Sequence, residues 1–280
     1  MNSWQITVVS YVRGMYKVLP YSLYICDKVI RIEEEHKGSF LRFCRGYIVK
    51  EPAPEPDYTI KVYQNEIDKF RQVPRSKCNA GISAFLEETE KLRSVANTKW
   101  DDQISGDLIL KKLAVSLLQG ERTLFIHGSV VAHKKSAFMF TAPSGIGKTT
   151  HSLLWTKYLQ DAYILNGDKP FISTGEKIMA WGSPWCGSEQ YNRNEGVELK
   201  AICILRRAEK NLLTEISADE AFPMLAKQTG DPDPSDYRTK IWLMEGLERL
   251  RGRVKFYLYE MNNLLEEEAF HTTYDVLSKL

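Results

Sequence analysis

One stretch constrains the fold of this chain more than any other: Thr141-Ala-Pro-Ser-Gly-Ile-Gly-Lys-Thr-Thr150. The apolar run Ala137–Phe140 precedes it and predicts a buried strand, and the segment from His151 to Tyr158 follows it and predicts a helix. A glycine-bearing turn between a strand and a helix presents backbone N–H groups to an anion, and the helix adds the positive end of its dipole. The stretch therefore predicts a loop that binds phosphate.

The residue types of the predicted loop have separate tasks. Gly145 and Gly147 let backbone N–H groups close around phosphate without obstruction from a Cβ atom. Lys148 is expected to bridge the β- and γ-phosphates, and the Thr149 hydroxyl to bind Mg²⁺. The predicted nucleotide-binding residues are Ser144, Gly145, Ile146, Gly147, Lys148, Thr149 and Thr150. Ala142 replaces the first glycine of the usual G-x-x-x-x-G-K-[ST] pattern, so a plain strand–helix turn with an incidental lysine is the alternative.

Composition argues against several classes of function. The 280 residues carry 38 basic and 36 acidic side chains, a net charge of +2, which gives no electrostatic reason to expect nucleic acid or membrane partners. Hydrophobic residues make up 43% of the chain, enough for a packed core. The five cysteines lack C-x-x-C spacing, and neither a long apolar segment nor a basic leader is seen, so we expect a cytoplasmic protein with reduced thiols.

Strand, helix and turn signals predict a small β-rich domain of unassigned role at residues 1–100, and an α/β domain with the glycine-bearing loop at residues 101–280. A linker is expected near residues 95–102. In the first domain the patterns predict strands at Ile6–Val9, Tyr21–Ile25 and Tyr58–Tyr63 and a helix at Ile82–Leu92. In the second domain they predict helices at Ser105–Leu118, at Ala218–Gln228, from the cap Ser235 to Leu250, and at Leu264–Leu280. They predict hairpins over residues 124–140 and 171–181, and single strands at Ala162–Leu165 and Arg253–Tyr259. They also predict that strands at Ala201–Leu205 and Leu212–Ile216 pair with each other.

A site that uses a nucleoside triphosphate also needs an acidic side chain near the γ-phosphate. Asp168 follows a short apolar strand, and we expect its carboxylate to bind Mg²⁺ or to accept the proton of an acceptor hydroxyl. His127 ends a strand upstream of the loop, where its imidazole could assist proton transfer or hold a phosphate oxygen. On position alone, Asp168 also fits a plain turn, and His127 a hydrogen-bonded histidine at a strand end. His133 is expected in an exposed turn and His151 on the helix after the loop.

The segment Gly182-Ser-Pro-Trp-Cys-Gly187 has an unusual composition. It predicts either a lid over the substrate or nucleotide, or a surface loop anchored by Trp185. Arg193 follows it and is a candidate phosphate ligand. Cys186 has no basic or histidine partner nearby in the sequence, so it is a weak candidate for a nucleophile.

Three motifs taken together resemble the C-terminal catalytic domain of HPr kinase/phosphorylase: Ile126-His-Gly128, Ala142–Thr150 and Asn166-Gly-Asp-Lys-Pro170. They are similar above all to the HPr kinase-related proteins of bacteria, including those found beside peptide-modification genes. Those proteins also tend to carry a loop like Gly182–Gly187 and a strand like Leu199-Lys-Ala-Ile202. The resemblance covers about residues 105–280.

The resemblance implies the fold shared with phosphoenolpyruvate carboxykinase, an α/β sheet domain with a phosphate loop. It implies that His127 is the active-site histidine, that Lys148 and Thr149 bind phosphate and Mg²⁺, and that Asp168 is the second acid of an Asp–Asp pair. Gly167 stands where the first acid is expected, so one carboxylate must do the work of two, or the metal site is weakened. The resemblance extends neither to the N-terminal region, nor to HPr as the acceptor, nor to the dephosphorylating activity.

These observations favour an ATP-dependent phosphotransferase that phosphorylates a hydroxyl, with a serine or threonine of a small protein or peptide as the expected acceptor. Asp168 and His127 are the expected catalytic residues, Thr149 and Asp168 the expected metal ligands, and ATP and Mg²⁺ the expected cofactors. Two alternatives stay open: a small-molecule kinase, and a nucleotide-binding regulatory module without transfer activity. No nucleic acid or membrane partner is expected, and a homo-oligomer is left open.

Overall fold

The computed structural model describes residues 20–35, 44–50, 52–71, 97–187, 189–230, 236–262 and 264–280. The predicted strand Ile6–Val9, the predicted helix Ile82–Leu92 and the expected helix cap Ser235 lie outside these residues. Contacts between Cα atoms divide the chain into two compact units, Met1–Tyr24 with Lys28–Leu113, and Ile25–Asp27 with Ala114–Leu280.

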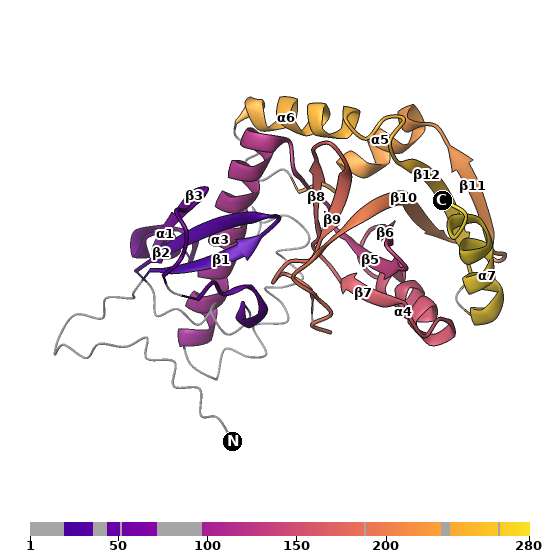
Figure 1. The fold of residues 1–280 in the computed structure, drawn as a ribbon, viewed down its shortest axis with the longest axis horizontal. Helices are drawn as coiled ribbons and strands as arrows, with labels where there is room; N and C mark the ends of the chain where they lie inside the picture. Colours follow the sequence, from indigo (N-terminus) through magenta and orange to yellow (C-terminus); the bar gives the residue numbers. More distant parts are fainter. Residues whose placement is uncertain are drawn as a thin grey trace, which may run out of the picture. The chain divides into compact units, whose positions relative to one another are not determined.

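A three-stranded sheet in the order β1-β2-β3 belongs to the N-terminal part of the chain. The elements here are β1 (Tyr21–Ile25), β2 (Lys28–Glu34), η2 (Arg45–Tyr47), β3 (Tyr58–Val62), α1 (Gln64–Arg71) and α3 (Asn97–Glu121) (Figure 1). Ile30 and Ile32 of β2 are fully buried while the residues between and beside them are partly exposed, because successive side chains of a strand point to opposite faces. The boundary expected at residue 100 falls inside α3, and residues 97–102 of the expected linker are helical.

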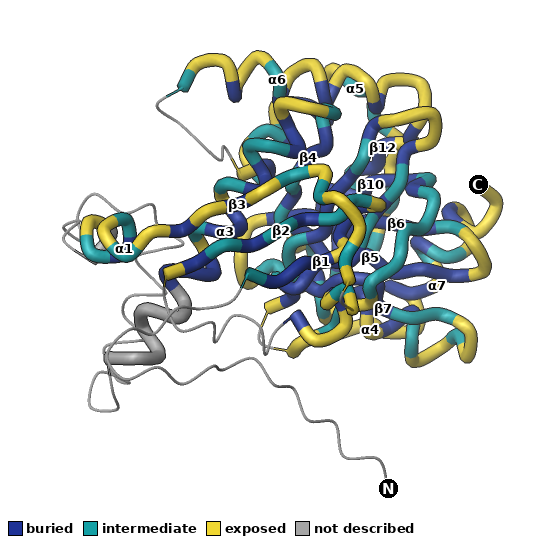
Figure 2. The backbone as a smooth tube through the Cα atoms, turned by 60° about the vertical axis from the view of Figure 1, so that its left-hand side comes forward, coloured by how far each residue is buried: buried dark blue, intermediate teal, exposed yellow. Residues whose placement is uncertain are grey.

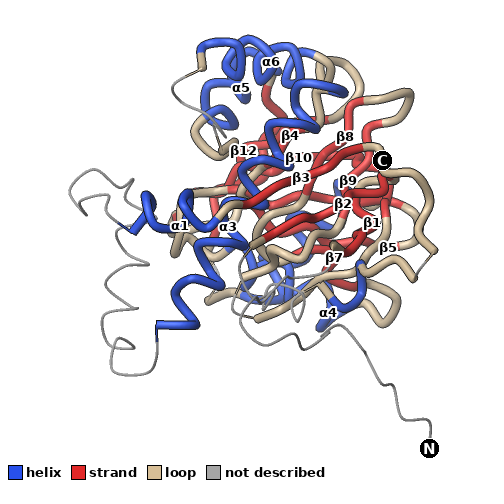
Figure 3. The backbone as a smooth tube through the Cα atoms, turned by 90° about the vertical axis from the view of Figure 1, so that its left-hand side faces the viewer, coloured by secondary structure: helices blue, strands red, loops and turns tan. Residues whose placement is uncertain are grey.

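The second unit is a mixed α/β structure built on a nine-stranded sheet. Its strands are β4 (Leu124–Phe125), β5 (Gly128–His133), β6 (Ser136–Thr141), β7 (Tyr163–Asn166), β8 (Phe171–Thr174), β9 (Ile178–Trp181), β10 (Gly196–Arg207), β11 (Leu212–Ile216) and β12 (Lys255–Met261). Its helices, apart from the end of α3, are α4 (Lys148–Tyr158), α5 (Ala218–Ala226), α6 (Tyr237–Glu248) and α7 (Glu266–Leu277), drawn in blue beside the red strands in Figure 3.

Four strands of this sheet end or begin at one common edge. β6 and β10 pair in parallel, with Thr141 opposite Ile204, so their carboxyl ends lie together. β5 is antiparallel to β6, which brings its amino end at Gly128 to the same edge. β7 is antiparallel to β5, with Asn166 opposite Val130, so the carboxyl end of β7 arrives there too. Residues that follow β6, β7 and β10 or precede β5 therefore meet at this edge, where ligands commonly bind in α/β sheets.

Helices cover both faces of the sheet. On one face, Trp155 of α4 and Phe270 of α7 belong to an apolar cluster with residues of β6, β10 and β12. On the other face, Phe222 of α5 and Leu247 of α6 belong to a second cluster with the same three strands. Figure 2 shows the result: the central strands are mostly dark blue, and the outer side of α6 is yellow.

Several local predictions for this unit are confirmed, and two are wrong. The predicted hairpins are present as β5–β6 and β8–β9, and the helix predicted at Ala218–Gln228 is present as α5, which a capping box of Ser217 and Glu220 opens. The prediction that residues 212–216 pair with residues 201–205 is wrong, because β12 lies between β10 and β11 and pairs with both. The prediction that His133 is exposed is also wrong. It is buried at the end of β5, with Nε2 3.0 Å from Asp161 Oδ1 and its ring beside Trp155.

His151 fixes α4 to the core through a single ring nitrogen. Its imidazole is fully buried between the rings of Phe140 and Tyr259. The Thr273 hydroxyl donates to the carbonyl of Phe270 and accepts from the Trp155 indole, so it accepts a second hydrogen bond from Nε2–H of His151, 3.1 Å away. Burial lowers the pKa of His151 from 6.5 to about 3, and the ring is neutral in the folded protein.

The buried imidazole predicts a loss of stability in mild acid. The unfolded chain takes up a proton at His151 below pH 6.5 and the folded chain does not, so stability falls as the pH drops from 6.5 toward 3. We expect this residue to contribute a loss of about 1–2 kcal/mol between pH 7 and pH 5. Urea denaturation of the wild type and of His151→Phe at both pH values measures it. The variant should lose less stability than the wild type over this interval, and equal losses would contradict the assignment.

Candidate active site

The glycine loop, residues 142–147, connects β6 to α4. Gly145 has φ +78° and Gly147 φ +120°, values in the left-handed region that favours glycine. Gly147 is the cap residue of α4, and no side chain of the described residues caps the helix there, so its first N–H groups are available to an anion. Ala142 is fully buried in the cluster that contains Phe140, so alanine at the first glycine position packs into the core.

Lys148 is the first residue of α4, and its side chain folds back over the glycine loop. Its Nζ donates to the carbonyl oxygens of Ala142, at 3.0 Å, and Pro143, at 3.2 Å. Burial lowers the pKa of Lys148; the carboxylate of Asp168 opposes this shift and the ammonium of Lys169 adds to it. Lys148 therefore lies within electrostatic reach of both neighbouring charges.

The carboxylate of Asp168 lies between an imidazole and an ammonium group. Its Oδ1 is 3.1 Å from His127 Nε2, and its Oδ2 is 2.5 Å from Lys169 Nζ. Partial burial raises the pKa of Asp168, but the hydrogen bonds and charges of His127 and Lys169 outweigh burial and hold this pKa below its usual range. Asp168 is therefore ionised at neutral pH, and its low basicity suits a metal ligand or a hydrogen-bond acceptor better than a strong base.

Asn166, the last residue of β7, holds the Asp168 backbone in place. Its Oδ1 accepts hydrogen bonds from the N–H groups of Asp168, at 3.0 Å, and Lys169, at 2.7 Å, and its Nδ2 donates to the carbonyl of Ser183. The carbonyl of Asp168 accepts a hydrogen bond from Gly128 N–H, the residue after His127. The turn is thus fixed to β5 on one side and to the segment around Ser183 on the other.

The Trp185 loop, residues 182–187 and 189–195, packs against the same turn. The N–H of Gly167 donates to Tyr191 O at 2.9 Å, and the N–H of Lys169 donates to Trp185 O at 3.1 Å. A Cβ atom built at Gly167 would lie 2.9 Å from the carbonyl oxygen of Cys186. The backbone of the Trp185 loop therefore occupies the space that a first acid at position 167 would need.

Two other residues of this region have structural roles. The guanidinium of Arg193, a candidate phosphate ligand by sequence, lies over the ring of Tyr163 at 3.8 Å from its centroid, at the amino end of β7 and away from the glycine loop. Burial raises the pKa of Cys186 although Asn192 donates a hydrogen bond to its sulfur. This thiol is protonated at neutral pH and a poor nucleophile. Pro184 and Cys186 are buried, whereas Gly187, Glu189 and Gln190 are exposed, so the Trp185 loop is packed against the protein at its start and open to solvent further on.

Arg207 contacts the glycine loop and could not be recognised from the sequence. It is the exposed last residue of β10, and its guanidinium donates to the carbonyl of Gly145 at 2.5 Å. Its sequence neighbours give no motif; the pairing of β10 with β6 places it there. Because this bond orients a loop peptide and adds a positive charge beside it, we assign Arg207 a positioning role at the loop.

Replacing Arg207 with glutamine is expected to weaken nucleotide binding about three- to tenfold, the value of one exposed charge-assisted hydrogen bond. Titration with a fluorescent ATP analogue measures the change. Arg206→Gln is the matched control, because the neighbouring guanidinium pairs with Glu260 at 2.9 Å and does not contact the loop in this structure. Equal affinities of Arg207→Gln and the wild type would contradict the assignment.

The residues expected to hold Mg²⁺ lie next to each other. The Thr149 hydroxyl donates to the carbonyl of Gly167 at 3.4 Å, which places it beside the Asp168 turn. Among the described residues, no group of three or more His, Cys, Asp or Glu side chains is placed to hold a metal ion by itself. A hydroxyl and one carboxylate nevertheless fit Mg²⁺, which prefers oxygen ligands and takes the rest from water and phosphate.

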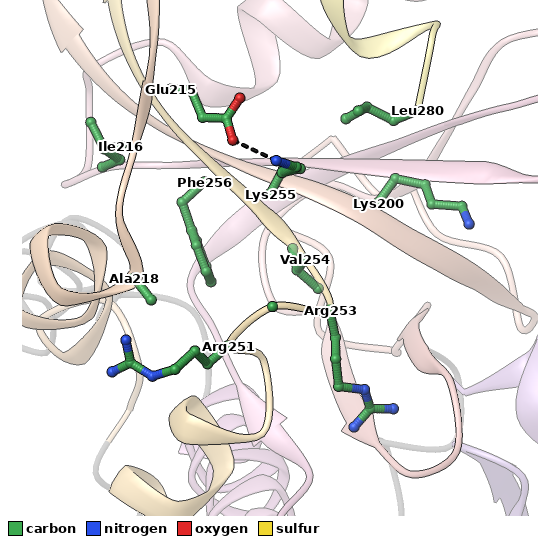
Figure 4. Close-up of a pocket in the computed structure, with 11 residues that line it drawn as sticks. Lys200, Glu215, Ile216, Ala218, Arg251, Arg253, Val254, Lys255, Phe256 and Leu280 are labelled. Carbon is green, nitrogen blue, oxygen red and sulfur yellow. Dashed lines mark hydrogen bonds and ion pairs between the residues drawn. The ribbon is translucent and has the colours of Figure 1, made fainter.

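A cleft at the opposite edge of the sheet is not the candidate site. It lies where β12 begins and holds four cationic side chains, drawn in Figure 4: Lys200, Arg251, Arg253 and Lys255. Lys255 pairs with Glu215 at 2.6 Å, Lys200 with Glu198 at 2.7 Å, and Arg251 with Asp219 at 2.8 Å. Arg253 donates to the carbonyl oxygens of Gly175 and Glu176. Because these donors are already engaged, the cleft offers an anion little.

No family model matches this chain, and no curated protein matches it. Among solved structures, the chain is similar to the Hpr(Ser) kinase/phosphatase from Coxiella burnetii, with 12% identity and a TM-score of 0.33 over 56% of this chain and 99% of that chain. Within the part of the chain that the structure describes, none of the helices has the length and apolar character needed to cross a membrane.

Proposed function

We propose that this protein is an ATP-dependent phosphotransferase that phosphorylates a hydroxyl group. The observation that carries the proposal is the meeting of Lys148, Asp168 and His127 at one sheet edge, with Asp168 Oδ1 3.1 Å from His127 Nε2. The motifs Ile126–Gly128, Ala142–Thr150 and Asn166–Pro170, which resemble those of HPr kinase/phosphorylase, also support a phosphotransferase. ATP would supply the phosphoryl group, and Mg²⁺ bound with it would neutralise part of the negative charge of the phosphates.

In this proposal the residues of the site have distinct tasks. The N–H groups of the glycine loop and of the α4 start hold phosphate oxygens, and Lys148 exchanges its two loop carbonyls for phosphate. Thr149 and Asp168 bind the metal ion. Asp168 also accepts a hydrogen bond from the acceptor hydroxyl and orients it; a weak base suffices, because the transition state of phosphoryl transfer is loose. His127 keeps the Asp168 carboxylate in place.

The acceptor that we propose is a serine or threonine of a small protein or peptide, in line with the sequence resemblance. The test is incubation with γ-labelled ATP and a library of short peptides, each paired with a version in which alanine replaces serine and threonine. Label on the hydroxyl peptides and not on their alanine partners supports the proposal. Label only in a small metabolite would redirect it to a small-molecule kinase.

A second candidate, a nucleotide-binding regulatory module, is favoured by one observation. Position 167 offers no carboxylate, and the Trp185 loop leaves no room for one. Nucleotide binding without transfer to any hydroxyl acceptor, and without hydrolysis, would support this candidate against the phosphotransferase.

A further inference from the structure

Lys169 is a charged residue at the site that the proposed function leaves unused. Its backbone is held at three points: its N–H donates to Asn166 Oδ1 at 2.7 Å and to Trp185 O at 3.1 Å, and its carbonyl accepts from Ser183 Oγ at 2.6 Å. Its side chain is 38% exposed and ends at Asp168 Oδ2. A fixed backbone thus carries a long side chain whose charged end is partly in solvent.

The ammonium of Lys169 pairs with Asp168 and lies where it could pair with a second anion instead. Asp168 bonds to His127 through one carboxylate oxygen and to Lys169 through the other. The Thr149 hydroxyl, next to Lys148 at the start of α4, donates to the carbonyl of Gly167 at 3.4 Å, so the turn that carries Lys169 lies beside the start of α4. A lysine ammonium is a compact charge on a flexible stem, and it can exchange one anionic partner for another by rotating side-chain bonds.

We propose that Lys169 recognises the γ-phosphate: when a nucleoside triphosphate occupies the glycine loop, its ammonium moves from Asp168 Oδ2 to the terminal phosphate. This inference rests on the proposed function only in assuming that the loop binds nucleotide. Terminal phosphate carries more negative charge than one carboxylate, so the ammonium gains by the exchange. The exchange frees Asp168 Oδ2 for the metal ion or the acceptor hydroxyl.

The proposal has a consequence for selectivity. A diphosphate lacks the group that draws Lys169 away, so the ion pair with Asp168 persists and the carboxylate stays occupied. Lys169 should therefore contribute to the affinity for a triphosphate and little to the affinity for a diphosphate. The ammonium of Lys169 would also add a positive charge, beside that of Lys148, at a site where Gly167 replaces one of the two expected acids.

The test compares binding of a non-hydrolysable ATP analogue and of ADP, both with Mg²⁺, by isothermal titration of the full chain. Lys169→Gln should lose about fivefold to tenfold in affinity for the ATP analogue, with ADP affinity changed less than twofold. Lys169→Arg, which keeps the charge, should recover part of the loss. Lys135→Gln is the matched control, because Lys135 lies in the β5–β6 turn at the other end of β6.

The outcomes separate this inference from the proposed function. If the wild type binds both nucleotides and Lys169→Gln weakens both equally or neither, Lys169 does not recognise the γ-phosphate, and the phosphotransferase proposal stands. If the wild type binds neither nucleotide, both proposals fall. Thermal melting of each variant shows whether it is folded. If Lys169→Gln does not fold, Lys169→Met, which also removes the charge, takes its place, and a ratio of ATP-analogue to ADP affinity equal to that of the wild type overturns the inference.

Discussion

Replacing Asp168 with asparagine is expected to lower the rate of phosphoryl transfer about 10²- to 10⁴-fold, because one carboxylate both binds the metal ion and orients the acceptor hydroxyl. Asparagine keeps the size of the side chain but removes its charge, so it holds Mg²⁺ and the acceptor hydroxyl poorly. Affinity for ATP should change only severalfold, because the glycine loop and Lys148 hold most of the phosphate. Initial rates with γ-labelled ATP, together with nucleotide titration, separate the two effects.

Asp161→Asn is the matched control for this prediction. Asp161 pairs with buried His133 at the other edge of the sheet, and its side chain is 60% exposed. It should leave the transfer rate within about twofold of the wild type. A rate for Asp168→Asn equal to that of Asp161→Asn would remove Asp168 from the mechanism.

Introducing the missing acid as Gly167→Asp is expected to destabilise the protein by about 2–3 kcal/mol and to bring no gain in activity. Gly167 is buried, and its new Cβ atom would lie 2.9 Å from Cys186 O and 3.5 Å from the Tyr191 Cβ atom. The chain must then displace the Trp185 loop or strain the turn that carries Asp168. Urea denaturation measures the loss.

Gly175→Asp is the control for position 167. Gly175 lies in the β8–β9 turn, and a Cβ atom built there meets nothing within 4 Å. This variant should change the free energy of unfolding by less than about 0.5 kcal/mol. If Gly167→Asp is as stable as this control, the Trp185 loop does not exclude a side chain at position 167.

Local patterns in the sequence predict those parts of the site that are built from a single continuous segment of the chain. The strand, glycine loop and helix of residues 137–158 form one continuous signal, and the turn at residues 166–170 another. The structure also brings His127 and Asp168, 41 positions apart, within 3.1 Å, although their chemical roles stay predictions.

Long-range contacts account for what the sequence does not reveal. Arg207 reaches the glycine loop only because β10 pairs in parallel with β6. β11 is separated from β10 because a later strand, β12, inserts between them. His133 is buried by Trp155 and Tyr274, which come from two helices elsewhere in the chain. Local propensity carries no information about such partners.

The contact between Gly167 and the Trp185 loop also limits how this protein can evolve. A single base change turns any glycine codon into one for an acidic residue, because GGN codons become the aspartate or glutamate codons GAN, so mutation can bring an acid to position 167. Folding rejects it unless the loop near Cys186 and Tyr191 shortens or turns away in the same lineage. Position 167 and the loop are therefore expected to change together among descendants, with an acid accompanying a loop of different length.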